Sequence, residues 1–437
     1  FLKDLGQHLS NCGIYMTETD LLSYLLWADD LFLISSTPDG LQKLLNDLYD
    51  YCKKWHLIVN TLKTKVLIYT NKRQLPEDTH FYFNGKPVDI TEKYEYLGCL
   101  FTKKPSKTVQ ADAALNNARR ALFKVYGYLK PFGQKLPTVA CHLFDTLIKP
   151  VIEYGSEVWA AGANLNEIDR LERKFLKSIL NVKEQTANAA VYGEYGRIPL
   201  SFKIKEKVIK YFVKLQSKNT ECPTKHAFET SRNLHDLGYT TWYTHAVRLN
   251  REFGLIHLID TTAPPKLTDT LKSTIKNAII SHYKEQWENM DIAGHTKLET
   301  YRQFKNEFKP EAYLRLPQKK YRNALAHFRT SSHHLAIETG RHTKPITPQD
   351  QRLCKMCELG EIENEEHVLL TCQAYSESRQ TLFNIARKHI PNISDLTKQE
   401  QLCAILCATE MDLITELGKY LAGLEVKRLN VNREPSQ

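Results

Sequence analysis

The pattern of apolar and polar residues changes character near residue 105. Before that point, short apolar runs predict β-strands within residues 21–35, 57–59, 66–69, 81–88 and 94–102. Asn84-Gly85 predicts a two-residue hairpin turn within residues 81–88. One helix interrupts the strands after Thr37, a capping residue that is followed by Pro38 at the first helical position. Beyond residue 105 the apolar residues recur mostly at helical spacing. The fold class predicted is therefore α+β, with a small antiparallel sheet and helices first and a mainly α-helical region after it.

Two adjacent acids define the candidate chemistry. Asp29 and Asp30 interrupt the apolar run LLSYLLWADDLFLIS of residues 21–35. Placing two like charges between buried flanks is costly unless a positive charge lies against them. A β-hairpin with both carboxylates at its turn would present them together to a divalent cation. A solvated turn is the alternative interpretation.

Composition narrows the class of protein. The chain has 437 residues, 42% of them hydrophobic and 25% charged, which is typical of two to four globular domains and not of a disordered chain. Its net charge of +10 is compatible with a nucleic-acid partner. Ten cysteines are too dilute for a disulfide scaffold. No apolar run approaches the roughly 20 residues of a membrane span, and no secretory signal opens the chain. We expect an intracellular protein, nuclear or cytoplasmic, that is not secreted and has no membrane partner.

A cluster of soft metal ligands lies near the C-terminus, with the spacing Cys354-x2-Cys357-x9-His367-x4-Cys372. Two cysteines separated by two residues suit a turn whose thiolates face one ion, and the histidine and third cysteine can complete a tetrahedron. The spacing predicts a structural Zn²⁺ site that holds together a small unit. Free buried cysteines are the alternative.

Basic side chains concentrate in two places. Residues 168–180 form a predicted helix with a basic face, and residues 314–344 contain a single acid, Glu338. Phosphate contacts by these cations, with stacking of bases on Tyr321 and Phe328, would bind nucleic acid, whereas a solvated charged face is the alternative. The candidate nucleic-acid-binding residues are Arg170, Arg173, Lys174, Lys177, Arg315, Lys319, Lys320, Arg322, Arg329 and Arg341.

Several of these segments carry a family resemblance. Residues 27–30, Trp-Ala-Asp-Asp, resemble the aromatic-Ala-Asp-Asp box of reverse transcriptases, although Trp27 departs from the usual Tyr or Phe. Residues 147–159 (LIKPVIEYGSEVW), 173–177 (RKFLK) and 189–194 (AAVYGE) are similar to LINE polyproteins. The Cys-Cys-His-Cys element, preceded by Arg352, is similar to one near the C-terminus of the family. The chain thus resembles the C-terminal part of a LINE-type (non-LTR) retrotransposon reverse transcriptase.

The resemblance implies a domain order and a chemistry. It implies part of the palm at residues 1–105, a helical thumb at 106–200, a helical region at 201–345, a zinc-knuckle-like unit at 346–380 and a helical tail at 381–437. Asp29 and Asp30 would hold two Mg²⁺ ions that assist the addition of dNTPs to a DNA primer, with an RNA strand as the template. Lys63, which we favour over Lys65 in the similar Asn…Lys-Thr-Lys element, would protonate the departing pyrophosphate, whereas a lysine in a solvated turn is the alternative. Tyr96, Leu97 and Gly98 resemble the primer-gripping turn.

The same resemblance implies that parts of the enzyme are missing from this chain. Only 28 residues precede Asp29, which leaves no room for the fingers or for the third catalytic aspartate of the family. The first residue is Phe1, so we expect a fragment that would not polymerise alone. Two other functions stay open: a non-catalytic nucleic-acid-binding module and an inert remnant of a retroelement.

Overall fold

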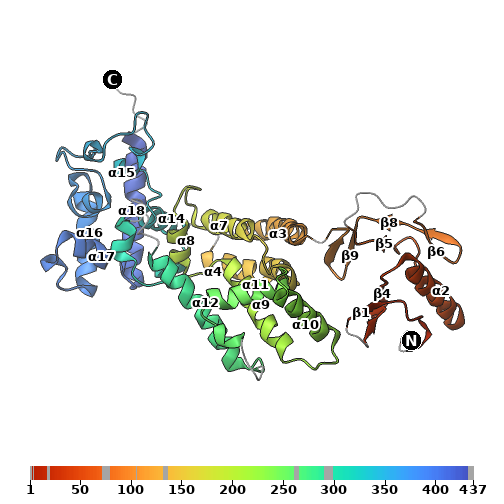
Figure 1. Ribbon diagram of the computed structural model, residues 1–437. Helices are drawn as coiled ribbons and strands as arrows, with labels where there is room; N and C mark the ends of the chain where they lie inside the picture. Colours follow the sequence, from red (N-terminus) through yellow and green to blue (C-terminus); the bar gives the residue numbers. More distant parts are fainter. Residues whose placement is uncertain are drawn as a thin grey trace. The chain divides into compact units, whose positions relative to one another are not determined.

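The computed structural model describes residues 2, 4–16, 20–70, 79–104, 106–130, 136–259, 265–289 and 299–431 (Figure 1). The described part is mostly helical and contains five two-stranded sheets, a mixture that agrees with the predicted α+β class. The chain forms two compact units. Unit 1 comprises residues 1–114, 153–164 and 204–278, and unit 2 comprises residues 115–152, 165–203 and 279–437. None of the described helices is long and apolar enough to span a membrane.

The strands of unit 1 pair as short hairpins. Antiparallel pairs join β1 to β2, β3 to β4, β6 to β7 and β9 to β10, and a parallel pair joins β5 to β8. A single antiparallel sheet is therefore not formed by the described residues. The bounds are β1 Ile14–Tyr15, β2 Leu21–Leu22, β3 Tyr24–Trp27, β4 Asp30–Leu33, β5 Val66–Leu67, β6 Phe81–Phe83, β7 Lys86–Val88, β8 Ile90–Thr91, β9 Lys93–Tyr96 and β10 Cys99–Thr102.

Two strand predictions need correction. Residues 57–59 are not a strand, and residues 94–102 are two strands joined by a turn at Leu97 and Gly98. The predicted hairpin around Asn84-Gly85 is confirmed. Both of its turn residues have positive φ angles, 52° and 70°, as a two-residue turn of a twisted hairpin requires.

Helix α2, Pro38–Trp55, carries the core beneath these hairpins. Thr37 caps it as predicted, because its hydroxyl accepts a hydrogen bond from the backbone N–H of Gly40 at 3.1 Å. Apolar residues spaced by three and four positions, among them Leu44 and Leu48, are buried in one cluster with Phe81 of β6. The short helix α1, Leu5–His8, lies in the same cluster through Leu5.

The remaining elements of unit 1 are helical. Trp242 and Tyr243 at the start of α11 pack with Phe212 and Phe228, at ring-centroid distances of 5.4–6.4 Å. Tyr243, Phe212 and Phe228 are buried, and Trp242 is half-buried beside them. The helices are α6 Ser156–Trp159, α10 Pro223–Asp236 and α11 Trp242–Glu252, with parts of α9 Leu200–Gln216 and α12 Asp269–Asn289.

Unit 2 contains the longer helices of the C-terminal half. Helix α18 packs against α14 and α16. Gly418 makes this packing possible, because a Cβ atom there would lie 2.6 Å from Cβ of Tyr321. The helices are α3 Lys107–Leu129 (in large part), α4 Pro137–Leu143, α5 Lys149–Glu153, α7 Asn166–Leu180, α8 Asn188–Tyr195, α13 Glu299–Phe304, α14 Lys319–Arg329, α15 Ala336–Thr339, α16 Ser376–His389, α17 Lys398–Leu406 and α18 Met411–Val431, with a π-helix at η1 Phe144–Ile148.

Candidate functional site

The two acids lie at the end of the β3–β4 hairpin. Trp27 of β3 pairs with Asp30 of β4, so Ala28 and Asp29 form the two-residue turn. Both carboxylates are exposed. Ala28 has a φ angle of 55°, a conformation that is strained for a residue with a side chain and that recurs at functional sites. The sequence thus brings Asp29 and Asp30 together at one exposed bend.

Strand β9 joins this bend to a second candidate residue. The Tyr96 hydroxyl donates to the backbone oxygen of Asp30 at 3.3 Å, and its ring lies 5.2 Å from that of Phe32. Two residues earlier on the same face, the Tyr94 hydroxyl donates to the backbone oxygen of Lys63 at 3.3 Å. One strand therefore holds both the Asp-Asp hairpin and the Lys63 turn. Tyr94 was missed in the sequence, although its spacing of two from Tyr96 places the two side chains together.

The predicted primer-gripping residues form the tight turn of the β9–β10 hairpin. Leu97 and Gly98 have φ angles of 47° and 73°. The Tyr154 hydroxyl donates to the backbone oxygen of Leu97 at 2.7 Å, and a Cβ atom on Gly98 would lie 3.1 Å from the Tyr154 ring. Glycine is required here both by the backbone angle and by the close approach of the tyrosine.

Lys63 and Lys65 lie in and just after the turn that begins at Asn60, and their ammonium groups have different surroundings. Asn60 begins this turn and accepts the Lys63 backbone N–H on its side-chain oxygen at 3.2 Å. The ammonium of Lys65 lies 2.6 Å from Asp89, so its charge is compensated. Lys63 is exposed and has no ion-pair partner among the described residues. The choice of Lys63 over Lys65 as the candidate proton donor is compatible with this arrangement.

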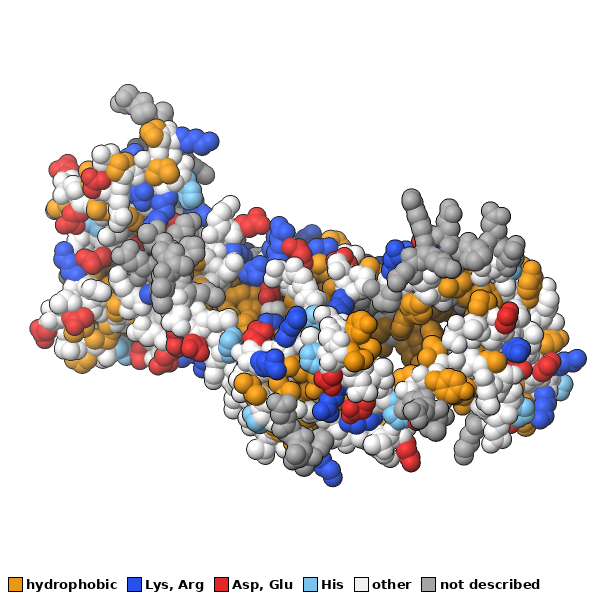
Figure 2. All heavy atoms as spheres, viewed as in Figure 1, with side chains coloured by type: hydrophobic (Ala, Val, Ile, Leu, Met, Phe, Trp, Pro, Cys, Tyr) orange, Lys and Arg blue, Asp and Glu red, His pale blue; other side chains and the backbone are white. Residues whose placement is uncertain are grey.

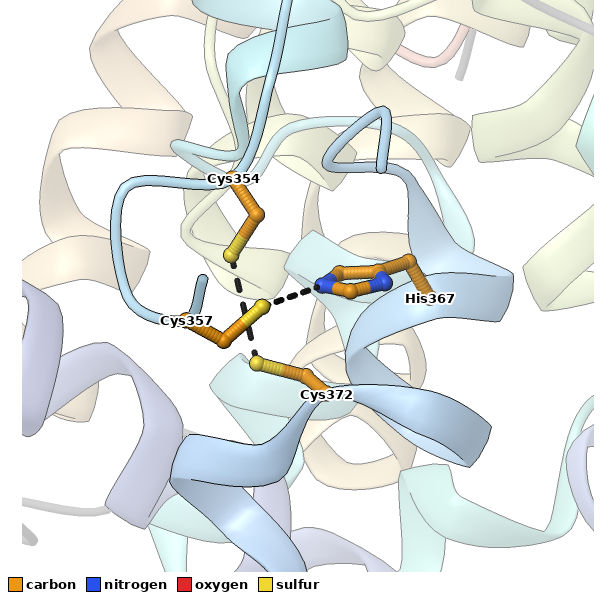
Figure 3. A group of neighbouring side chains, drawn as sticks. All are labelled: Cys354, Cys357, His367 and Cys372. Carbon is orange, nitrogen blue, oxygen red and sulfur yellow. Dashed lines mark hydrogen bonds between the residues drawn. The ribbon is translucent and has the colours of Figure 1, made fainter. Parts of the chain in front are cut away.

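The four predicted zinc ligands converge in unit 2 (Figure 3). Cys354 and Cys357 lie in a loop closed by the antiparallel bridge between Leu353 and Ile362. His367 begins the π-helix η6, His367–Thr371, and Cys372 follows its last residue. The ligand atoms of all four residues lie within 4.8 Å of one another. The Sγ atoms of Cys354 and Cys372 are 3.9 Å apart, and Cys357 Sγ lies 3.4 Å from His367 Nε2.

These distances fit a tetrahedral zinc ion. Zn–S bonds of about 2.3 Å and Zn–N bonds of about 2.0 Å imply separations of roughly 3.5–3.8 Å between the ligand atoms. Glu361 Oε2 lies 2.7 Å from His367 Nδ1, so it accepts that proton and leaves Nε2 facing the three sulfur atoms. Glu361 was missed in the sequence, although an acid shortly before a ligand histidine is a usable signal.

Burial keeps two of the three cysteine thiols protonated when no metal is bound. Burial raises the pKa of the Cys354 thiol to about 12 and also raises the pKa of Cys372. Cys354 and Cys372 are therefore neutral thiols in the metal-free site, and a cation binding there must displace their protons. Burial also acts to raise the pKa of Cys357, but hydrogen bonds to its sulfur outweigh burial and lower that pKa. The donor set, three cysteines and one histidine with no open position, is that of a structural site.

Three predicted nucleic-acid contacts are instead internal. Lys177 is 9% exposed, and its ammonium donates to the backbone oxygen of Glu184 at 2.6 Å. Arg322 is 2% exposed and donates to the backbone oxygen of Leu316 at 2.6 Å. Arg329 is 3% exposed and pairs with two acids, Glu194 at 2.8 Å and Glu311 at 3.0 Å. The prediction that these three side chains contact nucleic acid is therefore wrong, because their charges are used inside the protein.

The same correction applies to Phe328, which is buried and cannot serve as a stacking surface. The other basic candidates stay predictions. Arg170 and Lys174 are exposed and pair with Glu167 and Glu184, whereas Arg341 pairs with Glu338. Arg315, Lys319 and Lys320 are exposed, Arg173 is half-buried, and Tyr321 is half-buried.

Comparison with known proteins relates the chain to proteins of transposons, among them RNA-directed DNA polymerases. No protein-family model matches it. The chain is 29% identical over 163 residues to an uncharacterised transposon-derived protein of Caenorhabditis elegans, a match that covers 36% of this chain and 55% of that protein.

Two Drosophila melanogaster proteins, named as RNA-directed DNA polymerases from transposon BS and from transposon X-element, are 25% identical over 161 residues and 19% identical over 158 residues. These matches cover 35% and 36% of this chain but only 18% and 17% of the polymerases. The chain thus matches about half the length of the first relative and less than a fifth of the other two.

Proposed function

We propose that this chain is part of a non-LTR retrotransposon reverse transcriptase, contributing the end of the palm, the thumb and a C-terminal zinc unit. The observation that carries the proposal is the exposed Asp29-Asp30 bend, held by Tyr96 on the same strand that holds the Lys63 turn through Tyr94. Relatedness to RNA-directed DNA polymerases of transposons supports it. The partners would be an RNA template, a DNA primer or target, and dNTPs once upstream sequence completes the site.

The residues of this chain would divide the work of nucleotidyl transfer. Bound Mg²⁺ would activate the primer hydroxyl and neutralise charge on the leaving pyrophosphate. Asp29, in the turn itself, would ligate the cations, and Asp30 would share or support that coordination. Lys63 would donate a proton to the pyrophosphate. The Leu97–Gly98 turn would approach the primer end.

The zinc unit would have a structural task. Three cysteines and His367 would hold one Zn²⁺ ion, and three exposed cations of the same unit, Arg315, Lys319 and Lys320, would contact phosphates.

Primer extension tests the catalytic proposal. The chain would be expressed within the longest reading frame that contains it, and dNTP incorporation would be measured on a primed RNA template with Mg²⁺. Asp29→Asn is expected to lower the rate at least about a thousandfold, since it removes a metal-binding charge worth several kcal/mol in the transition state. Asp50→Asn, at another exposed acid of unit 1, is the matched control. Full activity of Asp29→Asn would exclude the proposed role.

A further inference from the structure

The outward face of α3 combines cations and aromatic rings. It comprises eight exposed residues of unit 2, which we call the α3 face: Asn116, Asn117, Arg119, Arg120, Phe123, Lys124, Gly127 and Tyr128. Phe123 is 81% exposed and Tyr128 is 57% exposed. Figure 2 shows Lys and Arg side chains gathered over the part of the molecule occupied by α3 and α7.

The opposite side of the helix fixes this orientation. Ala118, Leu122, Val125 and Leu129 are buried at spacings of three and four residues, so the rest of the helix circumference faces outward. Tyr126 lies between the two sides, with its ring 6.0 Å from that of Phe175 in α7. The α3 face is therefore held outward by a packed helix.

The positive charge of the α3 face is not compensated locally. Residues 113–144 contain no Asp or Glu. Arg119 donates to the side-chain oxygen of Asn116 at 3.0 Å, and Arg120 donates to that of Asn117. An amide orients a guanidinium without neutralising it. The face thus keeps a charge of about three from Arg119, Arg120 and Lys124, which attracts a polyanion.

The geometry of the two rings favours unpaired bases. Five residues of helix separate them by about 7.5 Å along the axis and by roughly 140° around it, so they border the face on two sides. Arg120 and Gly127 lie between them, and a Cβ atom at Gly127 would meet nothing within 4 Å, which leaves the centre open. Aromatic rings beside cations stack on the faces of bases, and those faces are accessible in single strands but not inside a duplex.

We propose that the α3 face binds single-stranded nucleic acid, with bases stacked on Phe123 and Tyr128 and phosphates held by Arg119, Arg120 and Lys124. This inference rests on the proposed function only in taking the ligand to be a nucleic acid. It adds a single-strand contact that does not involve the Asp29-Asp30 bend or the zinc ligands.

Fluorescence anisotropy with the full chain tests the site. The probes are labelled 12-nucleotide rU and dT strands and a 12-base-pair RNA duplex, each measured between 50 and 300 mM KCl. Phe123→Ala with Tyr128→Ala is expected to weaken single-strand binding at least about tenfold, and Phe123→Trp with Tyr128→Phe is expected to retain it. Replacing Arg119, Arg120 and Lys124 by Gln is expected to reduce the salt slope by about two.

Two variants serve as matched controls. Tyr239→Ala removes another exposed tyrosine, and Arg387→Gln removes an exposed arginine that donates to Asn384 at 3.1 Å, as Arg119 does to Asn116. Neither should change affinity. Comparison of rU with dT identifies which single strand is preferred.

The outcomes separate this inference from the proposed function. Single-strand binding that is unchanged by Phe123→Ala with Tyr128→Ala would overturn the α3 face while leaving the proposed function standing. A duplex bound more tightly than either strand, with no effect of the aromatic variants, would also overturn it. If the unmodified chain binds none of the three probes, both the inference and the nucleic-acid partner of the proposed function fail.

Discussion

Replacing Cys357 by serine tests the contribution of metal binding to the stability of unit 2 without disturbing its core. Cys354 and Cys372 are buried, so changing either one would also disturb the core. Cys357 is half-buried, and its Sγ faces His367 Nε2 at 3.4 Å. Serine preserves the size of the side chain but replaces a thiolate by a poor zinc ligand. Any large effect of Cys357→Ser should therefore come from lost metal binding.

The size of the effect follows from linkage between binding and folding. Loss of a ligand should weaken zinc binding at least as much as loss of an outer hydrogen bond, which costs about 10- to 100-fold. At a free zinc concentration about 100-fold above the dissociation constant of the unmodified chain, bound zinc stabilises the fold by about 2.7 kcal/mol, and a variant whose affinity falls by well over 100-fold loses nearly all of this stabilisation. For a unit of this size the melting temperature should fall by roughly 5–10 °C. The same fall is expected when the unmodified chain is stripped of metal by a chelator.

Calorimetry and metal analysis by mass spectrometry check this prediction together. We expect about one equivalent of zinc in the unmodified chain, far less in Cys357→Ser, and no added effect of chelator on that variant. Cys403→Ser is the matched control, because Cys403 is half-buried, lies outside the cluster and donates only to the backbone oxygen of Gln303. A Cys357→Ser protein that keeps one equivalent of zinc and melts at the unmodified temperature would refute the assignment of Cys357 as a ligand.

Three further predictions concern single residues. Glu361→Gln should weaken zinc binding about 10- to 100-fold, because it removes the carboxylate 2.7 Å from His367 Nδ1. A competition assay with a chromogenic chelator measures this affinity. An unchanged affinity would contradict the role of Glu361 in orienting His367. Gly85→Ala should destabilise the protein by about 1–2 kcal/mol in chemical unfolding, because its turn needs a positive φ angle. Gly98→Ala should cost more, since a Cβ atom there would also lie 3.1 Å from the Tyr154 ring, whereas one at Gly85 would meet nothing within 4 Å. Equal losses would rule out the tyrosine contact. Burial lowers the pKa of His327, but its hydrogen bonds to Glu425 and to the backbone oxygen of Asn181 outweigh burial and raise that pKa above its ordinary value. The stabilisation is then complete below about pH 6.5 and is lost as the pH rises through the folded-state pKa, so the unfolding free energy should fall over that range and His327→Gln should flatten the fall.

Local sequence signals predicted local structure well. Thr37-Pro38 marked the start of α2, Asn84-Gly85 marked a hairpin turn, and the Asp29-Asp30 pair lies at the predicted bend. The four zinc ligands fall between Cys354 and Cys372, so their spacing alone was enough to bring them together. In each case the interacting residues are close in the chain, and the physical constraint acts within a single turn or loop.

Long-range pairing could not be predicted in this way. Arg329 belongs to a basic stretch of sequence, but its partner Glu194 is separated from it by 135 positions. A run of cations does not show which of them will find a buried acid, and that pairing decides whether a charge lies inside or outside. The α3 face is the converse case. Its charges stay outside because residues 113–144 offer no acid, a signal that is visible in the sequence but was overlooked beside the longer basic runs.

Three glutamates, Glu361, Glu363 and Glu365, connect the metal centre to the rest of unit 2. Glu361 accepts from His367, and Glu363 accepts from the backbone N–H of Ala336 at 2.7 Å and pairs with Arg428 of α18. Glu365 Oε1 lies 3.0 Å from His333 Nε2. Residues 361–365 thus contact a zinc ligand, the start of α15, the last helix and, through His333, the basic stretch.

Backbone hydrogen bonds attach residues 361–363 to the loop that carries the zinc ligand Cys354. The backbone N–H of Cys354 donates to the oxygen of Glu361 at 2.9 Å, and that of Glu363 donates to the oxygen of Arg352 at 2.9 Å. If the Cys354 loop loosens when the metal is lost, the contacts of Glu363 and Glu365 must loosen with it. Hydrogen exchange in Cys357→Ser should therefore increase at residues 331–338 and around Arg428 as well as in the loop itself. An increase confined to residues 354–372 would show that the zinc ion stabilises only its own loop.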